Sequence, residues 1–178
     1  MNVIDIGLAD LKQKMAEAYF PKEVRKRLLE CDISWNNRFR GATAGVAKFR
    51  KENGSEYRSI EISSKYIKQY PDQLKSIMLH EMIHIVLEIG ENHGKNFKIE
   101  MNRINKQLEL EGDHSRVSVR ISEDKRLPRD YKYTYFCRKC GQIYNRVRKP
   151  IDLKRNVCGR CYGKLVSSKI NEKIGSHK

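Results

Sequence analysis

Apolar side chains recur at helical spacing over residues 8–30, and Pro21 divides this stretch into two predicted helices. Beyond it the spacing shortens, and three segments have the pattern of strands: residues 33–36, 42–49 and 57–62. Arg40-Gly41 and Asn53-Gly54 supply turn residues between these strands. The first part of the chain therefore predicts two helices followed by a small sheet.

Three further segments are predicted to be helical. Residues 63–70 fit a short helix, and residues 95–110 fit a longer amphipathic one. Between them, residues 74–89 are apolar on nearly every side, which is typical of a buried helix, with Pro71-Asp72 as a start and Gly90 as a stop. This order of elements predicts an α+β fold in which a small antiparallel sheet packs beside helices.

The buried helix carries a string of five residues that begins at His80 and ends at His84, and His93 follows nine positions after His84. Histidines at i and i+4 project from one face of a helix, so His80 and His84 can hold one metal ion together. Glu81 lies beside that face, where it can accept a proton from a water molecule at the metal. Three histidines leave the fourth position of a tetrahedral zinc ion open, as a catalytic site requires. The alternative is a core helix whose histidines have other partners.

The composition indicates two parts of different charge. The chain has 178 residues, enough for one domain with a small appendage, and carries 37 Lys and Arg against 22 Asp and Glu. The formal net charge is +15, of which +13 lies in residues 116–178. A near-neutral domain, residues 1–115, therefore precedes a basic segment of the kind that binds polyanions. The alternative is a basic surface that only contacts solvent.

The basic segment contains two Cys-x-x-Cys pairs, Cys137 with Cys140 and Cys158 with Cys161, separated by 17 residues. Four thiolates at this spacing are typical of a closed, structural zinc site. So short a segment cannot build an adequate core alone, and the metal would supply much of its folding energy. The alternative is a pair of redox dithiols, but no strand–helix context of the thioredoxin type accompanies them. We expect a connector with one short strand at 116–130, then a basic zinc ribbon and tail at 131–178.

Cationic and aromatic side chains alternate around the four cysteines. Lys and Arg can contact phosphates, and aromatic faces can stack on unpaired bases. The cationic candidates for nucleic-acid contact are Arg138, Lys139, Arg146, Arg148, Lys149, Lys154, Arg155, Arg160 and Lys164. Their aromatic neighbours are Tyr131, Tyr133, Tyr135, Phe136, Tyr144 and Tyr162. Some of these aromatic residues must pack the ribbon, so none is assigned to a base from sequence.

The sequence also indicates where the protein works. It has no apolar run of about 18 residues, as a membrane span requires, and no basic start followed by a long apolar stretch. We therefore expect a cytoplasmic, nucleoid-associated protein, or a nuclear one if the source is eukaryotic. In that reducing compartment its five cysteines favour metal binding over disulfides.

Three other residues have open roles. His114 could be a metal ligand, but an exposed connector histidine fits its surroundings better. Glu88 could orient His84 or could be an exposed carboxylate. Cys31 is the cysteine left over, and we expect a buried thiol without metal.

Taken in order, these motifs resemble the SprT-like metallopeptidase family, which includes the eukaryotic DNA-dependent protease Spartan and bacterial SprT proteins. The resemblance rests on His80-Glu-Met-Ile-His84, on His93-Gly-Lys-Asn-Phe97 and on the two cysteine pairs, and it covers about residues 10–166. Upstream, Trp35, Ala44-Gly45 and residues 60–63 also look like the family's sheet. The interval between His84 and His93 is shorter than in Spartan.

The resemblance implies that His80, His84 and His93 are the catalytic zinc ligands and that Glu81 is the general base. It also implies cleavage of proteins attached to DNA, with DNA binding that activates the protease. The expected partners are DNA-bound protein substrates and DNA itself, single- or double-stranded, and no membrane. The expected cofactors are two zinc ions, one catalytic and one structural.

Two other functions stay open from sequence. One is a non-enzymatic nucleic-acid-binding protein in which both zinc ions are structural, although such a scaffold has no use for Glu81. The other is a peptidase that acts on soluble proteins and is not directed by DNA. Its activity should be indifferent to added DNA and to ionic strength.

Overall fold

The structure is a computed structural model that describes residues 7–39, 43–127 and 131–168, and the following statements concern these residues. The chain divides into two compact units, Met1–Leu127 and Pro128–Lys178. Three predicted features lie partly or wholly outside the described residues: the Arg40-Gly41 turn, the last residues of the connector and the end of the tail. Each unit is described by itself.

The two helices predicted before the sheet are confirmed as α1 (Leu8–Tyr19) and α2 (Lys22–Leu29). Pro21 is the N-cap residue of α2, where its lack of an N–H group costs the helix nothing. Buried Lys12 of α1 donates hydrogen bonds to the carbonyl oxygens of Leu29 and Cys31, which ties α1 to the end of α2. The two helices thus form one packed pair.

The first unit contains a mixed three-stranded sheet in the order β1-β3-β2: β1 (Asp32–Asn36), β2 (Gly45–Glu52) and β3 (Ser55–Ser63). The predicted turn joins β2 and β3 into an antiparallel hairpin, with φ values of 50° at Asn53 and 79° at Gly54. The prediction of an antiparallel sheet is wrong for β1, which pairs with β3 in parallel. The reason is topological: β1 and β2 lie at opposite edges of the sheet, and β3 follows β2 into the position between them. Strand β3 therefore runs antiparallel to β2 and parallel to β1.

The helix expected at 74–89 is α4 (Leu74–Val86), preceded by α3 (Ser64–Gln69) and the short 3-10 helix η2 (Pro71–Gln73). It ends before the predicted Gly90 because two arginines bind its last carbonyl oxygens. Arg58 on β3 donates to Ile85 and Leu87, and Arg27 on α2 donates to Val86 at 3.0 Å. The chain then leaves the helix in an extended conformation at Leu87.

Helix α5 (Lys95–Leu110) has the predicted bounds, and Phe97, Ile104 and Leu108 form its buried face. Ile99 of the same helix is exposed. The segment after α5 departs from the predicted connector because it has no strand and packs against the first unit as far as Leu127. Val117 is only 1% exposed, and the short 3-10 helix η3 (Glu123–Lys125) follows it. The first unit therefore extends well beyond residue 115.

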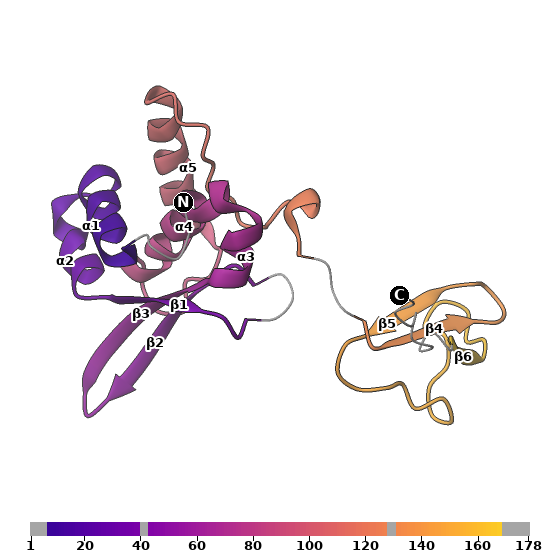
Figure 1. Ribbon diagram of the computed structural model, residues 1–178. Helices are drawn as coiled ribbons and strands as arrows, with labels where there is room; N and C mark the ends of the chain where they lie inside the picture. Colours follow the sequence, from indigo (N-terminus) through magenta and orange to yellow (C-terminus); the bar gives the residue numbers. More distant parts are fainter. Residues whose placement is uncertain (1–6, 40–42, 128–130, 169–178) are drawn as a thin grey trace, which may run out of the picture. The chain divides into compact units, whose positions relative to one another are not determined.

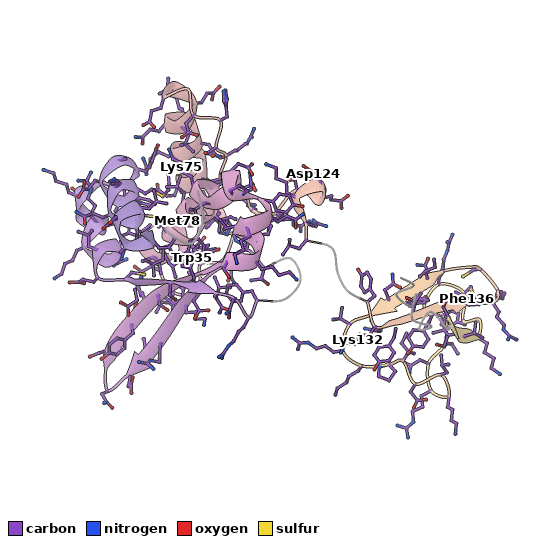
Figure 2. The ribbon with its side chains drawn as sticks, viewed as in Figure 1. Trp35, Lys75, Met78, Asp124, Lys132 and Phe136 are labelled. Atoms are coloured by element: carbon purple, nitrogen blue, oxygen red, sulfur yellow. The ribbon has the colours of Figure 1, made fainter. Side chains whose placement is uncertain are left out.

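The core of the first unit lies between the sheet and the helices. Helices α1, α2, α4 and α5 gather on one side of the sheet, and the tip of the β2–β3 hairpin extends beyond them (Figure 1). Met78 of α4 is fully buried in the middle of this core (Figure 2). No helix among the residues that the structure describes is long and apolar enough to span a membrane.

The second unit is a small antiparallel sheet in the order β5-β4-β6: β4 (Tyr133–Cys137), β5 (Ile143–Arg146) and β6 (Leu165–Ser168) (Figure 1). Its buried residues include Tyr135 and one cluster, which consists of Cys137, Cys158 and Leu165. The side chains packed around this cluster are only half-buried: Cys140, Tyr144, Ile151 and Cys161. Four of the seven residues in and around the cluster are cysteines, so little of the core is hydrocarbon.

Arg58, which donates hydrogen bonds to carbonyl oxygens at the end of α4, leads to a prediction about stability. We expect Arg58→Met to lower the free energy of unfolding by about 2 kcal/mol, because two helix carbonyls lose a charged donor in a poorly hydrated place. The Arg58 side chain is 13% exposed. Arg50→Met is the matched control on the same hairpin, since Arg50 is 71% exposed and forms an ion pair with exposed Glu52. Urea unfolding measures both changes, and equal losses would contradict this account of Arg58.

Candidate metal centres

Three histidine side chains converge in the first unit. His80 and His84 project from one face of α4, and His93 comes from the loop between α4 and α5. The Nε2 atom of His93 lies 3.0 Å from that of His80 and 3.2 Å from that of His84. Fully buried Phe97, in the first turn of α5, contacts all three rings, with centroid distances of 4.7–4.9 Å. The predicted histidine cluster is therefore formed.

The surroundings of His80 and His84 determine how these rings can bind a metal. His80 Nδ1 lies 2.8 Å from the carbonyl oxygen of Ser118, which can only accept, so Nδ1 carries the proton and Nε2 a lone pair. The backbone of Glu91 makes a hydrogen bond with His84. Burial lowers the pKa of His80 and of His84 to about 4, and the nearby imidazoles contribute to this lowering. Neutral imidazoles that meet in this way have the chemistry of a metal site.

The spacing of the nitrogens fits zinc. A tetrahedral zinc ion with Zn–N distances of about 2.0–2.1 Å separates its ligand nitrogens by about 3.3 Å. The observed separations of 3.0 and 3.2 Å are close to this value. The cluster supplies three ligands, so a fourth position would be open to water or substrate.

Glu81 lies next to the cluster and is buried, with 6% of its surface exposed. Burial raises the pKa of its carboxyl group to about 7, and a hydrogen bond from the backbone of Ala47 on β2 opposes this rise. A carboxyl group with this pKa can gain and lose a proton near neutral pH, as a general base must. The arrangement can therefore combine a Lewis acid with a proton acceptor.

Gly45 at the start of β2 allows this strand to approach Glu81. A Cβ atom at Gly45 would lie 2.8 Å from Glu81 Oε1 and 2.9 Å from its Cγ, which real side chains do not tolerate. Sequence reasoning noted Ala44-Gly45 only as part of the sheet and did not connect it with Glu81. A glycine at the start of a predicted strand was the available signal for this close approach.

The second cluster contains the four predicted cysteines, whose Sγ atoms all lie within 4.8 Å of one another. The Cys137–Cys161 and Cys140–Cys158 sulfur distances are 3.4 and 3.6 Å. Zn–S bonds of about 2.3 Å place tetrahedral sulfurs about 3.8 Å apart, so the cluster fits a zinc ion with no open position.

The backbone around the cysteines forms two similar knuckles. Gly141 N–H donates to the Cys137 carbonyl at 2.9 Å, and Tyr162 N–H donates to the Cys158 carbonyl at 2.8 Å. Both donors have positive φ, 71° for Gly141 and 57° for Tyr162. The Tyr144 hydroxyl lies 3.2 Å from Cys158 Sγ and, by donating to it, lowers the pKa of this thiol to about 6. A lowered thiol pKa favours the thiolate that metal binding requires.

The surroundings of the remaining candidate residues decide between the roles left open by the sequence. His114 is exposed and belongs to neither cluster, as expected. Glu88 lies beyond the end of α4, is exposed and pairs with Arg27 at 3.7 Å, so it does not orient His84. Cys31 is buried, and burial raises its thiol pKa to about 11. All nine cationic candidates of the second unit are exposed.

Comparison with known proteins gives consistent matches to one group. Residues 8–123 match the SprT-like family. The "Protein SprT-like" of Oceanobacillus iheyensis is 30% identical over 162 residues, which are 90% of this chain and 95% of that protein. The protein of the same name from Streptococcus equi subsp. zooepidemicus strain H70 is 28% identical, over 89% of this chain and 95% of its own length. The Bacillus cereus protein of this name is 33% identical over 74% of this chain and 78% of its own length. No solved structure matches the chain.

The two clusters predict two separable metal ions per chain. We expect His84→Ala to lose one ion and Cys158→Ser to lose the other, because each change removes a ligand from a different cluster. Cys158→Ser should also unfold the second unit, whose core depends on its cysteines. The metal content of the purified variants, measured by plasma mass spectrometry, checks this.

Matched controls come from residues outside both clusters. His114→Ala and Cys31→Ser should each retain two metal ions, since neither residue lies in a cluster. Two ions in His84→Ala would contradict the histidine site.

Proposed function

The chain belongs to the SprT-like family, and from this premise we propose that it is a zinc-dependent endopeptidase that cleaves proteins bound or crosslinked to DNA. The observation that carries the enzymatic part is the buried Glu81 beside three converging imidazoles. A cluster that held metal only for structure would have no use for this carboxylate, whose burial is unfavourable. The proposal implies that the protein works at the nucleoid, in the cytoplasm.

In the proposed reaction His80, His84 and His93 hold the zinc ion. When bound, zinc supplies a Lewis acid that acidifies a water molecule and polarises the scissile carbonyl. Glu81 accepts a proton from the attacking water and delivers it to the leaving amine when the C–N bond breaks. The hydrogen bond from the Ala47 backbone lowers the pKa of this carboxyl group and so favours the ionised form that accepts the proton.

The sheet supports binding of an extended substrate. Among the described strands β2 lies at one edge, and it approaches α4 closely where Gly45 meets Glu81. Backbone groups on a free strand edge can pair with an added peptide strand. We infer that the substrate chain lies along β2, which brings its backbone next to Glu81 whatever its side chains are.

The charge of the second unit supports DNA binding. Residues 131–168 contain ten Lys and Arg and a single acidic residue, Asp152. The nine cationic candidates are exposed, and of these Arg155 lies 3.6 Å from Asp152. Such a surface gains affinity for phosphates by releasing condensed counterions.

Three of the aromatic candidates are also exposed. Tyr135 and Tyr144 stabilise the ribbon, since the Tyr135 hydroxyl accepts from Ile151 N–H and the Tyr144 hydroxyl contacts Cys158 Sγ. The exposed aromatic residues are Tyr131, Tyr162 and Phe136, the last of which is labelled in Figure 2. Tyr162 is 80% exposed although its φ of 57° is unfavourable for a bulky side chain. An aromatic ring with this exposure is available to stack on an unpaired base, which supports the proposal.

The proposed mechanism predicts that Glu81→Gln abolishes proteolysis without loss of metal. The amide cannot accept the proton, so we expect the cleavage rate to fall by about 10²- to 10⁴-fold. The substrate is a protein crosslinked to DNA, compared with the same protein free, and gel analysis follows cleavage. Wild type should cleave the crosslinked form faster.

Glu88→Gln is the matched control, since Glu88 is an exposed carboxylate just beyond α4. It should cleave like wild type. Full activity of Glu81→Gln with zinc bound would contradict the mechanism. Equal cleavage of free and crosslinked protein would favour a peptidase that is not directed by DNA, and no cleavage by wild type with two zinc ions bound would favour a non-enzymatic DNA-binding protein.

The proposal that the second unit binds DNA predicts that removing positive charge weakens DNA binding only when the charge is removed from this unit. Changing Arg146, Arg148 and Lys149 to Gln should weaken DNA binding and reduce the slope of log K against log salt, by up to about 0.9 for each duplex phosphate that the variant no longer neutralises. The matched control changes exposed Lys14, Lys22 and Lys98 of the first unit to Gln, which alters the net charge equally. Fluorescence anisotropy at several salt concentrations measures both. Identical slopes for the two variants would contradict DNA binding through the ribbon.

A further inference from the structure

One segment of the first unit, residues 113–121, runs along α4 without regular structure of its own, and we call it the strap. Its contacts with α4 follow the direction of the helix: Asp113 pairs with Lys75 at 2.5 Å, Arg116 N–H donates to Ser76 Oγ at 3.1 Å, and Ser118 O meets His80 Nδ1 at 2.8 Å. Figure 2 labels Lys75, which pairs with the first residue of the strap, and Asp124, which follows the strap in the sequence. The strap thus reaches the histidine cluster.

The middle of the strap is held by one side chain of α5. Asn105 Nδ2 donates to the Val117 carbonyl at 2.9 Å, and Asn105 Oδ1 accepts from the Val117 N–H at 2.8 Å. The two bonds satisfy both backbone groups of a residue that is buried and belongs to no strand. They also fix the orientation of the backbone immediately before Ser118, whose carbonyl meets His80.

We propose that Asn105 is a positioning residue for the catalytic zinc site. It holds Val117 so that the Ser118 carbonyl oxygen accepts a hydrogen bond from His80 Nδ1–H, which keeps the His80 Nε2 lone pair directed at the metal. The inference rests on the proposed function, because it assigns zinc to the three histidines. It adds a residue 25 positions from His80 that touches no ligand atom.

A purely structural role for Asn105 makes a different prediction. If the side chain only satisfies the Val117 backbone, its loss weakens the fold but leaves the zinc affinity of the folded protein unchanged. If it positions His80, zinc affinity of the histidine site falls even where the protein stays folded. Loss of such outer contacts typically lowers metal affinity by about 10- to 100-fold.

The test measures the zinc dissociation constant of each site in the full chain, with free zinc set by a chelator buffer. His84→Ala retains only the ribbon ion and so identifies that site's constant. We expect Asn105→Ala to raise the dissociation constant of the histidine site by about 10- to 100-fold and to leave the ribbon constant unchanged. Thermal unfolding confirms that the zinc-loaded variant is folded.

Two further variants make the comparison specific. Ser76→Ala releases the strap at Arg116 without touching Asn105, and it should weaken the histidine site in the same direction. Gln107→Ala is the matched control, because this half-buried amide of α5 binds Ala18 O at 2.9 Å and not the strap. It should leave both zinc constants unchanged.

The outcomes separate this inference from the proposed function. Unchanged histidine-site affinity in Asn105→Ala, with zinc bound and peptidase activity in wild type, overturns the positioning role alone. Equal weakening by Asn105→Ala and Gln107→Ala also overturns it. Absence of zinc from the wild-type histidine site overturns the proposed function instead.

Discussion

The first unit depends on the burial of α4, and its site is a consequence of that burial. Ten of the thirteen residues of this helix are buried, so its polar groups need partners inside the protein. Each partner comes from a different element: Ala47 from β2 for Glu81, Ser118 from the strap for His80, and the Glu91 loop for His84. A shift of any of these elements would remove the partner of the buried Glu81 carboxyl group or of a half-buried histidine, and this couples the geometry of the site to the packing of the whole unit.

The sequence predicted the parts of this arrangement that depend on local spacing. The i and i+4 histidines, the Asn53-Gly54 turn and the bounds of α5 all follow from neighbours in the chain. It did not predict the parallel β1–β3 pair, because that pairing depends on a crossover between distant strands. Nor did it place the end of α4, since the bond from Arg58 to Ile85 spans 27 residues.

The strap was missed for a related physical reason. Residues 116–120 alternate like a strand, and a charged, irregular sequence around them resembles a connector. What holds the segment is a side-chain amide on α5 and a serine on α4, neither of which leaves a periodic signal. In the second unit, likewise, the six aromatic residues look equivalent in sequence. Only the contacts of Tyr135 and Tyr144 show that these two belong to the ribbon.

The two candidate zinc sites would carry net charges of opposite sign. In each unit, other side chains supply charge of the sign opposite to that of its site. Three neutral imidazoles leave a bound Zn²⁺ with its full double charge, and the nearby Glu81 carboxylate offsets part of it. The ion in turn opposes the effect of burial on this carboxyl group, whose pKa of about 7 would otherwise leave it half protonated. Four thiolates around Zn²⁺ would carry a net negative charge, and residues 131–168 contain ten Lys and Arg against one acidic residue. Positive charge in the same unit would favour such an anionic metal site. Under the proposed function the same side chains would also contact phosphates, so one set of charges would serve both the fold of this unit and its proposed partner.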